Sequence, residues 1–338
     1  MPLPCVVLSD LLSMPLSQSA IVHQTGSADV FSIESIPIPP PKAKQVLIRH
    51  TAIGVNFIDT YFRSGLYEVP LPAILGDEAV GIVQQVGEGV SEFSVGQRVA
   101  YSSSKGAYTQ YRCIDTQDIV PLTDGVDDVA VAASLLRGMT VEYLFCRLYE
   151  LKAGETILIH AAAGGVGSIA CQWAKAIGAT VIGTVSSAEK AAVAHANGCD
   201  HTIIYSQQDF VKEVARITKG KKVDVVYDSV GKDTFMQSLD CLKTRGLMVS
   251  FGNASGKPDP LDVLTLSKKG SLYLTRPTLY HYTQSRDELV SSAKRYLAML
   301  EQGSIKVSVG KTFRLDQVAD AHRYLTSRAR IGSPVLIP

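Results

Sequence analysis

The chain has 338 residues, of which 46% are hydrophobic and 19% are charged, and its formal net charge is +1. This length predicts about two domains, and the composition is that of an ordinary globular protein with enough apolar residues for two cores. Lysine and arginine are spread along the chain, which argues against a surface built to bind nucleic acid or an anionic membrane.

The first 17 residues are mildly apolar, but they contain Asp10 and have no basic start, so they make a poor secretory signal peptide. Met14 could be the true start, because the patterned sequence begins near Ser19; whether residues 1–13 are native stays open. The six cysteines show no C-x-x-C spacing, which predicts buried thiols in a reducing compartment. We therefore expect a cytoplasmic protein.

Residues 19–122 combine many glycines with short alternating runs and regular turns. The proline-rich run at 37–41 is extended and cannot be helical. Residues 45–52 (QVLIRHTA) alternate like a β-strand, and the polar and aromatic stretch GVNFIDTYFRSGLY (54–67) follows. This pattern predicts a small β-barrel-like domain.

The pattern changes at Asp127, where helices are predicted over 129–135 and 140–148. Strands and helices then alternate, which predicts an α/β domain with a parallel sheet. A long amphipathic helix is predicted over 285–302, and a last helix over 315–327. The predicted strands of this part are 156–160, 180–185, 201–205, 223–227, 247–251 and 272–274.

The segment TILIHAAAGGVG (156–167) organises this second part, because it joins a buried strand to a turn of small residues and a predicted helix over 168–178. Such a unit holds the pyrophosphate of a dinucleotide at the helix N-terminus. Gly164 and Gly167 fit the second and third glycines of G-x-G-x-x-G, with Ala162 at the first. A tight crossing that binds nothing would also need small residues, so the context decides.

The next strand, 180–185, supplies that context and also indicates which cofactor binds. It ends in Ser186 and Ser187 instead of an acid, and Lys190 lies on the following turn. An acid would bind the ribose 2′-hydroxyl of NADH, whereas serines and a lysine suit a 2′-phosphate. The sequence therefore predicts NADPH, with Glu189 on the ribose of NADH as the alternative.

Taken together, the motifs resemble those of the medium-chain dehydrogenase/reductase superfamily, and within it the zinc-free quinone oxidoreductase (zeta-crystallin-like) family. The motifs are GVNFIDTYFRSGLY (54–67), LGDEAVGIVQQVGEGV (75–90), HAAAGGVGSIACQWAK (160–175), YDSVG (227–231), GLMVSFGN (246–253), TRP (275–277) and SRARIGSPVLIP (327–338). The resemblance implies an α/β fold with a Rossmann nucleotide-binding domain, a doubly wound parallel sheet, plus a GroES-like β-barrel-type catalytic domain. The implied parts are an N-terminal extension (1–18), the catalytic domain (19–135 and 277–338) and the Rossmann NADP-binding domain (136–276).

Zinc-dependent relatives carry a cysteine where this chain has Asn56 and a histidine where it has Asp77. An oxygen-only set of Asn56, Asp77 and Glu78 is not one that zinc favours, so no metal is expected. Without a Lewis acid, hydride transfer to a ketone leaves an alkoxide about as basic as hydroxide, with a pKa near 15.7. A quinone leaves a phenol-like anion with a pKa of about 10, a difference of roughly 8 kcal/mol. Conjugated acceptors are therefore favoured.

These features predict a metal-free NADPH:quinone reductase in which the nicotinamide passes hydride to a quinone held between the two domains. An enone or enal double-bond reductase on the same fold is the alternative, and a non-enzymatic nucleotide- or RNA-binding crystallin-like protein is a more remote one. No nucleic-acid or membrane partner is expected. The family usually pairs edge strands into a homodimer, for which residues 270–275 are the candidate.

The resemblance also implies the site residues. The expected catalytic set is Asn56, Asp59, Tyr61 and Thr140. Asn and Asp are also common turn formers, and Tyr61 and Tyr67 suit a core equally well. Residues expected to contact the cofactor are Asn56, Thr140, Ala163, Gly164, Gly165, Val166, Gly167, Ser186, Ser187, Lys190, Tyr205, Ser229, Phe251, Gly252, Arg276 and Arg328. His160 and Cys171 are expected to pack in the core. The physiological acceptor, one- against two-electron transfer and dimer against tetramer stay open.

Overall fold

The structure is a computed structural model that describes residues 15–327 and 330–338. These residues form two compact units: a first unit of residues 15–136 and 307–338, and a second unit of residues 137–306. The second unit extends about 30 residues beyond the domain end predicted at residue 276, because helix α10 (Arg286–Glu301) packs inside it. Ser292 of α10 donates a hydrogen bond to the buried Glu142 over 2.8 Å, and a Cβ atom at Gly138 would overlap the ring of Tyr296.

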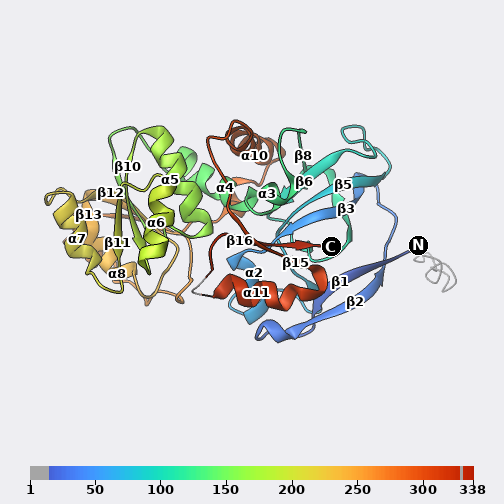
Figure 1. The fold of residues 1–338 in the computed structure, drawn as a ribbon, viewed down its shortest axis with the longest axis horizontal. Helices are drawn as coiled ribbons and strands as arrows, with labels where there is room; N and C mark the ends of the chain where they lie inside the picture. The colour runs from blue at the N-terminus through green and yellow to red at the C-terminus, as the bar shows by residue number, and fades with distance from the viewer. Residues whose placement is uncertain (1–14, 328–329) are drawn as a thin grey trace. The chain divides into compact units, whose positions relative to one another are not determined.

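The second unit is built on a six-stranded sheet in the order β11-β10-β9-β12-β13-β14, and every neighbouring pair is parallel (Figure 1). Its strands are β9 (Thr156–Ile159), β10 (Thr180–Val185), β11 (His201–Ile204), β12 (Val223–Asp228), β13 (Leu242–Ser250) and β14 (Tyr273–Thr275). This order is that of a doubly wound sheet, which confirms the predicted Rossmann-type fold. Strand β13 begins five residues earlier than predicted, because its exposed start Lys243–Arg245 is polar and hides the strand pattern.

Helices cover this sheet, as the alternation of the sequence requires. They are α4 (Leu135–Tyr143, continuing as a π-helix over Leu144–Leu148), α5 (Gly165–Ile177), α6 (Ala188–Ala196), α7 (Phe210–Ile217), α8 (Phe235–Ser238) and α9 (Leu264–Lys268). Phe210 and Val214 of α7 and Phe235 of α8 form one core with Leu158 and Ile182 of the sheet. Because strand side chains alternate in direction, these buried side chains lie on one face.

The first unit has two sheets. A three-stranded sheet runs β2-β1-β4, and a seven-stranded sheet runs β15-β16-β3-β5-β6-β8 with β7 also paired to β3. The strands are β1 (Leu16–Val22), β2 (Phe31–Pro37), β3 (Gln45–Gly54), β4 (Ala73–Ile74), β5 (Glu78–Val86), β6 (Arg98–Ser102), β7 (Tyr111–Asp115), β8 (Val120–Pro121), β15 (Val309–Arg314) and β16 (Ser333–Ile337). Strand β1 begins at Leu16, three residues before the predicted start of patterned sequence, and residues 1–14 lie outside the described part.

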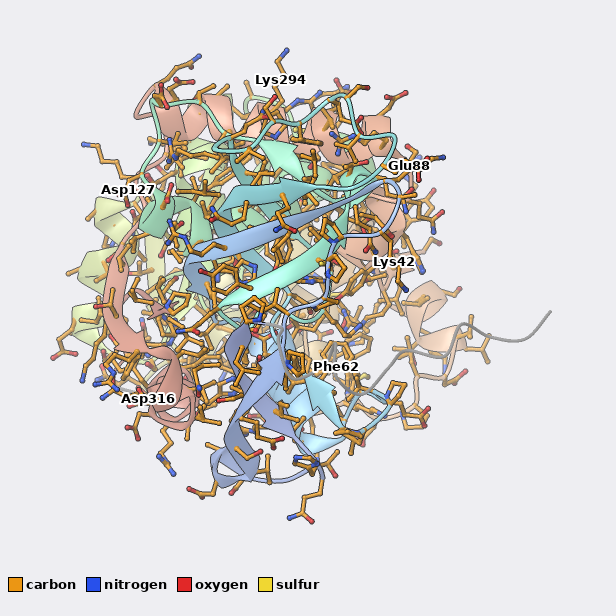
Figure 2. All side chains as sticks on the ribbon, turned by 90° about the vertical axis from the view of Figure 1, so that its right-hand side faces the viewer. Lys42, Phe62, Glu88, Asp127, Lys294 and Asp316 are labelled. Carbon is orange, nitrogen blue, oxygen red and sulfur yellow. The ribbon has the colours of Figure 1, made fainter. Side chains whose placement is uncertain are left out.

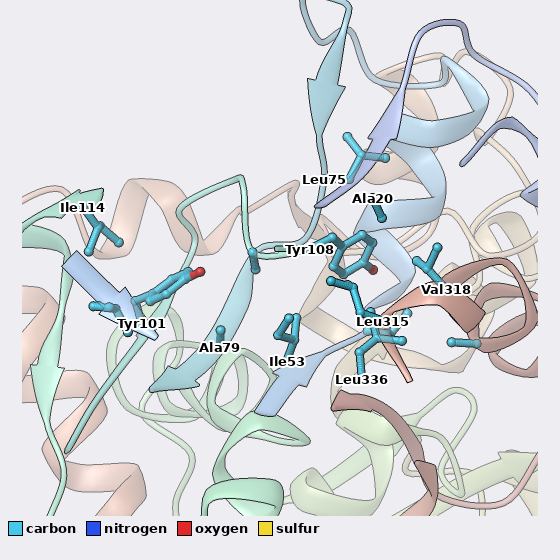
Figure 3. Close-up of a cluster of buried hydrophobic side chains, with 14 of the residues drawn as sticks. Ala20, Ile53, Leu75, Ala79, Tyr101, Tyr108, Ile114, Leu315, Val318 and Leu336 are labelled. Atoms are coloured by element: carbon cyan, nitrogen blue, oxygen red, sulfur yellow. The ribbon is translucent and has the colours of Figure 1, made fainter. Parts of the chain in front are cut away.

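Three helices complete the first unit: α2 (Phe57–Ser64), α3 (Asp128–Ala132) and α11 (Val318–Thr326). The predicted helix over 315–327 is a 3-10 turn, Leu315–Gln317, followed by α11. Figure 3 shows the buried core of this unit, in which the rings of Tyr101 and Tyr108 lie among aliphatic side chains. Figure 2 shows charged side chains such as Lys42 and Glu88 at the surface of this unit, whereas Phe62 of α2 is buried in its interior.

The thiols only partly follow the expectation that they are buried. Cys171, Cys199 and Cys241 are buried, but Cys113 and Cys146 are half-exposed, and Cys5 lies outside the described residues. Cys113 is on β7, which pairs with β3 on one side only, and this edge position leaves its thiol accessible. In residues 15–327 and 330–338, every helix is too short or too polar to cross a lipid bilayer.

Candidate active site

The turn after β9 is shaped by the absence of side chains. A Cβ atom at Gly167 would stand 2.8 Å from the Cα of Ala162 and would overlap the carbonyl oxygen of Ala161. The first turn of α5 therefore packs directly against the backbone that leaves the strand. Ala161 adopts a left-handed conformation with a φ of 55°, which glycine adopts more easily. The predicted helix begins three residues early, at Gly165, since glycines hid its start.

The neighbouring strand adapts to this turn. Ala162 stands at the position of the first glycine in the motif, and its Cβ would be 2.5 Å from a Cβ at Gly183 of β10. Gly183 thus makes room for the alanine that replaces a glycine. A Cβ at Gly165 would stand 2.8 Å from Cδ of Arg137, so the buried Arg137 side chain lies beside the turn. The sequence gave no signal for Arg137, because it lies 28 residues before Gly165.

Ser186 and Ser187 follow β10 and are half-buried. Ser187 caps α6, because its hydroxyl accepts the backbone N–H of Lys190 over 3.4 Å. A hydrogen bond from the same hydroxyl lowers the pKa of the exposed Glu189. Tyr205, directly after β11, is 55% exposed. The serine, lysine and tyrosine positions expected around the 2′-phosphate therefore lie at the carboxyl ends of two adjacent strands.

The turn after β12 is held by Asp228, which is buried. Its Oδ1 accepts the backbone N–H groups of Val230 (2.7 Å) and Gly231 (3.0 Å), and both its oxygens accept from the hydroxyl of Thr234. This is an Asx-type turn, which Asp followed by a glycine-containing segment favours. The sequence analysis singled out Ser229 in this motif but missed Asp228, although the residue type signals the turn.

The turn after β13 packs on the turn after β12. A Cβ at Gly252 would stand 2.9 Å from the Cα of Ser229, so the two backbones touch. Phe251 donates its backbone N–H to the carbonyl of Asp228 over 2.8 Å. Arg276, which follows β14, donates from Nη1 to the carbonyl of Ser250 over 2.9 Å. These turns and the glycine turn lie at one edge of the second unit, because all six strands are parallel.

Two further predictions concern buried residues of the second unit. His160 is a core histidine as predicted: its ring nitrogens contact the hydroxyls of Thr184 (2.9 Å) and Ser238 (2.8 Å). Thr140 is buried in α4. Arg328, expected to close on the phosphate, lies outside the described residues.

The other expected residues lie in the first unit, at the start of α2. Asn56 precedes the helix, and its backbone N–H donates to Oδ2 of Asp59 over 2.7 Å. The amide nitrogen of Asn56 donates to Oε2 of Glu78 over 2.7 Å, and Oε1 of Glu78 accepts the backbone N–H of Leu136. Turn formation by Asn and Asp is therefore present here, as the sequence alternative proposed.

Asp59, Asp77 and Glu78 are fully buried in the first unit. Burial, followed by repulsion from Asp77 and Glu78, raises the pKa of Asp59 to about 8, although hydrogen bonds from Asn56 and Tyr108 oppose this rise. Asp59 is therefore largely a neutral acid near neutral pH. Tyr61 is half-exposed and meets Tyr67 edge to face, with ring centroids 5.2 Å apart.

The residues around Asn56 do not fit a zinc ion. Asn56 turns its amide nitrogen, which cannot be a ligand, toward Glu78. The nearby carboxyl groups supply only oxygen, whereas zinc sites use histidine or thiolate. No three His, Cys, Asp or Glu side chains in the described part of the chain are grouped so as to hold a metal ion.

Two family matches cover most of the chain. Residues 42–145 match the alcohol dehydrogenase GroES-like domain, and residues 165–295 match the zinc-binding dehydrogenase domain. The quinone oxidoreductase of Pseudomonas aeruginosa is 48% identical over 315 residues, which cover 93% of this chain and 97% of the relative. The 2-haloacrylate reductase of a Burkholderia species is 46% identical and covers 95% and 98% of the two chains.

Solved structures agree with these matches. The Escherichia coli quinone oxidoreductase complexed with NADPH superposes with a TM-score of 0.93 at 46% identity, covering 95% of this chain and 100% of that chain. The quinone oxidoreductase of Pseudomonas syringae gives the same TM-score and identity. The chain therefore belongs to the quinone oxidoreductase family of the medium-chain dehydrogenase/reductase superfamily.

Proposed function

We propose that this protein is an NADPH-dependent reductase that reduces quinones without a metal ion. The observation that carries the proposal is the glycine turn after β9, where Gly167 lets α5 pack on the backbone of Ala161. A helix that begins against such a turn presents backbone N–H groups and a partial positive charge to a phosphate. Relatives 46–48% identical over nearly the whole chain are quinone oxidoreductases, and one is solved with NADPH.

The residues present fit this cofactor, because the space that Cβ atoms would fill at the turn is left open for a pyrophosphate. NADPH, when bound, supplies the hydride. We propose that residues 163–167 bind the pyrophosphate and that Ser186, Ser187 and Lys190 bind the 2′-phosphate. Ser229, Phe251, Gly252, Arg276, Tyr205 and Thr140 are proposed to complete the cofactor site, together with Asn56 and with Arg328.

On the acceptor side we propose Asn56, Asp59, Tyr61 and Thr140. The half-exposed ring of Tyr61 offers a flat apolar face to an aromatic acceptor. Asn56 is held in one orientation by Glu78, and Asp59 in turn holds the backbone of Asn56. The hydroquinone anion formed has a pKa of about 10, so water can supply its proton after the hydride has moved.

We also propose the cellular and domain-level properties expected from the sequence: a cytoplasmic enzyme with no nucleic-acid partner, a catalytic domain of residues 19–135 and 277–338, and an NADP-binding domain of residues 136–276. A homodimer is proposed through β14, which is an edge strand with an exposed apolar surface. Tyr273 is 62% and Leu274 37% exposed. Pairing two such edges would cover both.

A second acceptor class has a specific observation in its favour. The Burkholderia relative, 46% identical over 95% of this chain, reduces 2-haloacrylate by its name, and 2-haloacrylate contains a conjugated carbon–carbon double bond. Reduction of an enone or enal would place charge on an enolate, which also needs no metal. The same protein could therefore accept such substrates at lower rates than quinones.

One assay tests these proposals. The purified protein is mixed with NADPH and a panel of benzoquinones, naphthoquinones, enones and 2-chloroacrylate, and loss of the reduced-cofactor absorbance is followed. Oxidation with quinones at the highest kcat/KM supports quinone reduction, whereas a higher kcat/KM for enones supports the alternative. No oxidation of NADPH by any acceptor would overturn both and leave the non-enzymatic hypothesis.

A further inference from the structure

Four side chains of the first unit form a continuous line of hydrogen bonds, here called the relay. Nη1 of Arg63 lies 3.1 Å from Nδ1 of His322. Nε2 of His322 lies 3.0 Å from the hydroxyl of Tyr108, and that hydroxyl lies 2.7 Å from Oδ2 of Asp59. The relay thus joins α2 to α11 through a loop residue, across long stretches of sequence.

The chemistry of its members gives the relay one direction. Arginine can only donate, so Nδ1 of His322 must accept, and the single proton of the neutral ring is on Nε2. Nε2 therefore donates to the oxygen of Tyr108, and Tyr108 donates its own proton to Asp59. A protonated His322 would turn an N–H toward Arg63. Burial, and then Arg63, lower the pKa of His322 to about 3, which keeps the ring neutral.

The relay lies in an apolar environment. Asp59, Tyr108 and His322 are all buried within or beside the core of the first unit, and the His322 ring meets Phe31 edge to face at 4.8 Å. Figure 3 shows the Tyr108 ring among aliphatic side chains of that core. Burying polar groups costs free energy even when they are hydrogen-bonded, and well-packed apolar residues are often as stable. Stability alone therefore does not account for these residues.

We propose that Tyr108 and His322 are positioning residues of the reductase, which the relay makes by holding the carboxyl group of Asp59 where it accepts the backbone N–H of Asn56. This inference rests on the proposed function. Asp59 is the third residue of α2, and its contact with Asn56 fixes how the helix begins. Asn56 and Tyr61, both proposed on the acceptor side, are carried by this short helix.

Several charged groups act on Asp59, and they come from different elements. Asp77 and Glu78, which precede and begin β5, repel its charge, whereas Tyr108 donates to it. Arg63 lies at the far end of the relay, where Asp29 also acts on it. The Tyr108 hydroxyl favours the ionised form of Asp59. Its removal should therefore raise the pKa of Asp59 further and leave Oδ2 with one donor fewer.

The test compares two tyrosines of the same core. Tyr108→Phe removes the relay hydroxyl, while Tyr101→Phe removes a buried hydroxyl that contacts His50 over 3.0 Å and is outside the relay. We expect Tyr108→Phe to lower kcat for quinone by about 10-fold, since misplaced groups cost up to about 100-fold. KM for NADPH should stay within about twofold. The pH limb that reports Asp59 should move to higher pH, and Tyr101→Phe should change none of these.

His322 supplies a second pair of variants, which serves if Tyr108→Phe does not fold. The amide of His322→Gln can accept from Arg63 and donate to Tyr108, so it should keep kcat within about threefold of wild type, whereas His322→Phe should match Tyr108→Phe. Equal kcat values and pH profiles for Tyr108→Phe and Tyr101→Phe, or for the two His322 variants, would overturn the relay while the wild type stays active. A wild type that reduces no acceptor would overturn the proposed function itself.

Discussion

Gly167 lies so close to the carbonyl oxygen of Ala161 that a Cβ atom at this position would overlap that oxygen. Helix α5 can therefore start against the end of β9 only while residue 167 has no side chain. Gly164, in the same turn, is less constrained, because its Cβ would be 3.0 Å from the same oxygen and its φ of −77° suits any residue.

This difference predicts a graded effect on cofactor binding. Gly167→Ala should push α5 away from the turn and raise KM for NADPH by about 10-fold or more, because the backbone N–H groups no longer converge on the pyrophosphate. Gly164→Ala should have a smaller effect on KM. Steady-state kinetics of both variants measure this, and a larger effect at Gly164 would contradict the packing argument.

The burial of Asp59 predicts a pH dependence of stability. Its pKa is about 8 in the folded protein and about 3.9 in the unfolded chain, so between these values the folded state binds more protons. The free energy of unfolding should therefore fall as pH rises from about 4 to about 8. Asp59→Asn removes this ionisation, so its stability relative to wild type should increase over that range. Urea unfolding at a series of pH values measures both, and parallel curves would argue against a raised pKa.

Much of the second unit could be predicted from its sequence, because each strand is a short apolar run followed by a glycine or a small polar residue. The ends of β9, β10 and β12 therefore located the turns where a cofactor would bind. Local patterns could not find Asp228 or Arg137 as residues that shape these turns. Their roles depend on contacts with backbone or glycines elsewhere.

The first unit was less predictable for a related reason. Asn56 and Asp59 were found through a motif, but Tyr108 and His322 act on Asp59 from 49 and 214 residues... away in sequence. A tyrosine in a loop and a histidine on the buried side of α11 carry no sign of such a contact. Likewise, the packing of Tyr296 on Gly138 extends the second unit beyond the predicted boundary, and no local signal announces it.

Metal content can be measured directly. Asn56 directs its amide nitrogen to Glu78, and zinc would need histidine or thiolate where this chain has oxygen donors. We expect elemental analysis of the purified protein to find far less than one zinc per chain, and quinone reduction to continue in a chelator. About one tightly held zinc per chain, lost together with activity on chelation, would contradict this prediction.

The exposed edge of β14 predicts self-association. Tyr273 and Leu274 are 62% and 37% exposed on a strand with a neighbour on one side only. A second copy of the chain could pair with that strand and bury both side chains. Light scattering at micromolar concentration should give the mass of a dimer or tetramer, and Leu274→Lys should shift it toward the monomer. A wild type that is already monomeric would rule out this interface.

Cofactor choice depends on the end of β10. Ser187 is engaged in capping α6 and in a hydrogen bond that lowers the pKa of Glu189, so Lys190 is the basic group left to read a 2′-phosphate from this turn. Charged hydrogen bonds are worth about 1.5–3 kcal/mol. Lys190→Ala should therefore lower kcat/KM for NADPH by roughly 10- to 150-fold and leave kcat/KM for NADH nearly unchanged.

Glu189→Ala is the matched control for this prediction, because it removes the neighbouring charge on the same turn of α6. It should leave NADPH use intact, and it should slightly favour NADPH by removing a negative charge near the phosphate. If Glu189 instead binds the ribose of NADH, wild type should prefer NADH and Glu189→Ala should be the damaging change. Measuring kcat/KM for both cofactors in wild type and both variants separates the two. Equal losses with NADPH and NADH in Lys190→Ala would mean that this lysine does not recognise the 2′-phosphate.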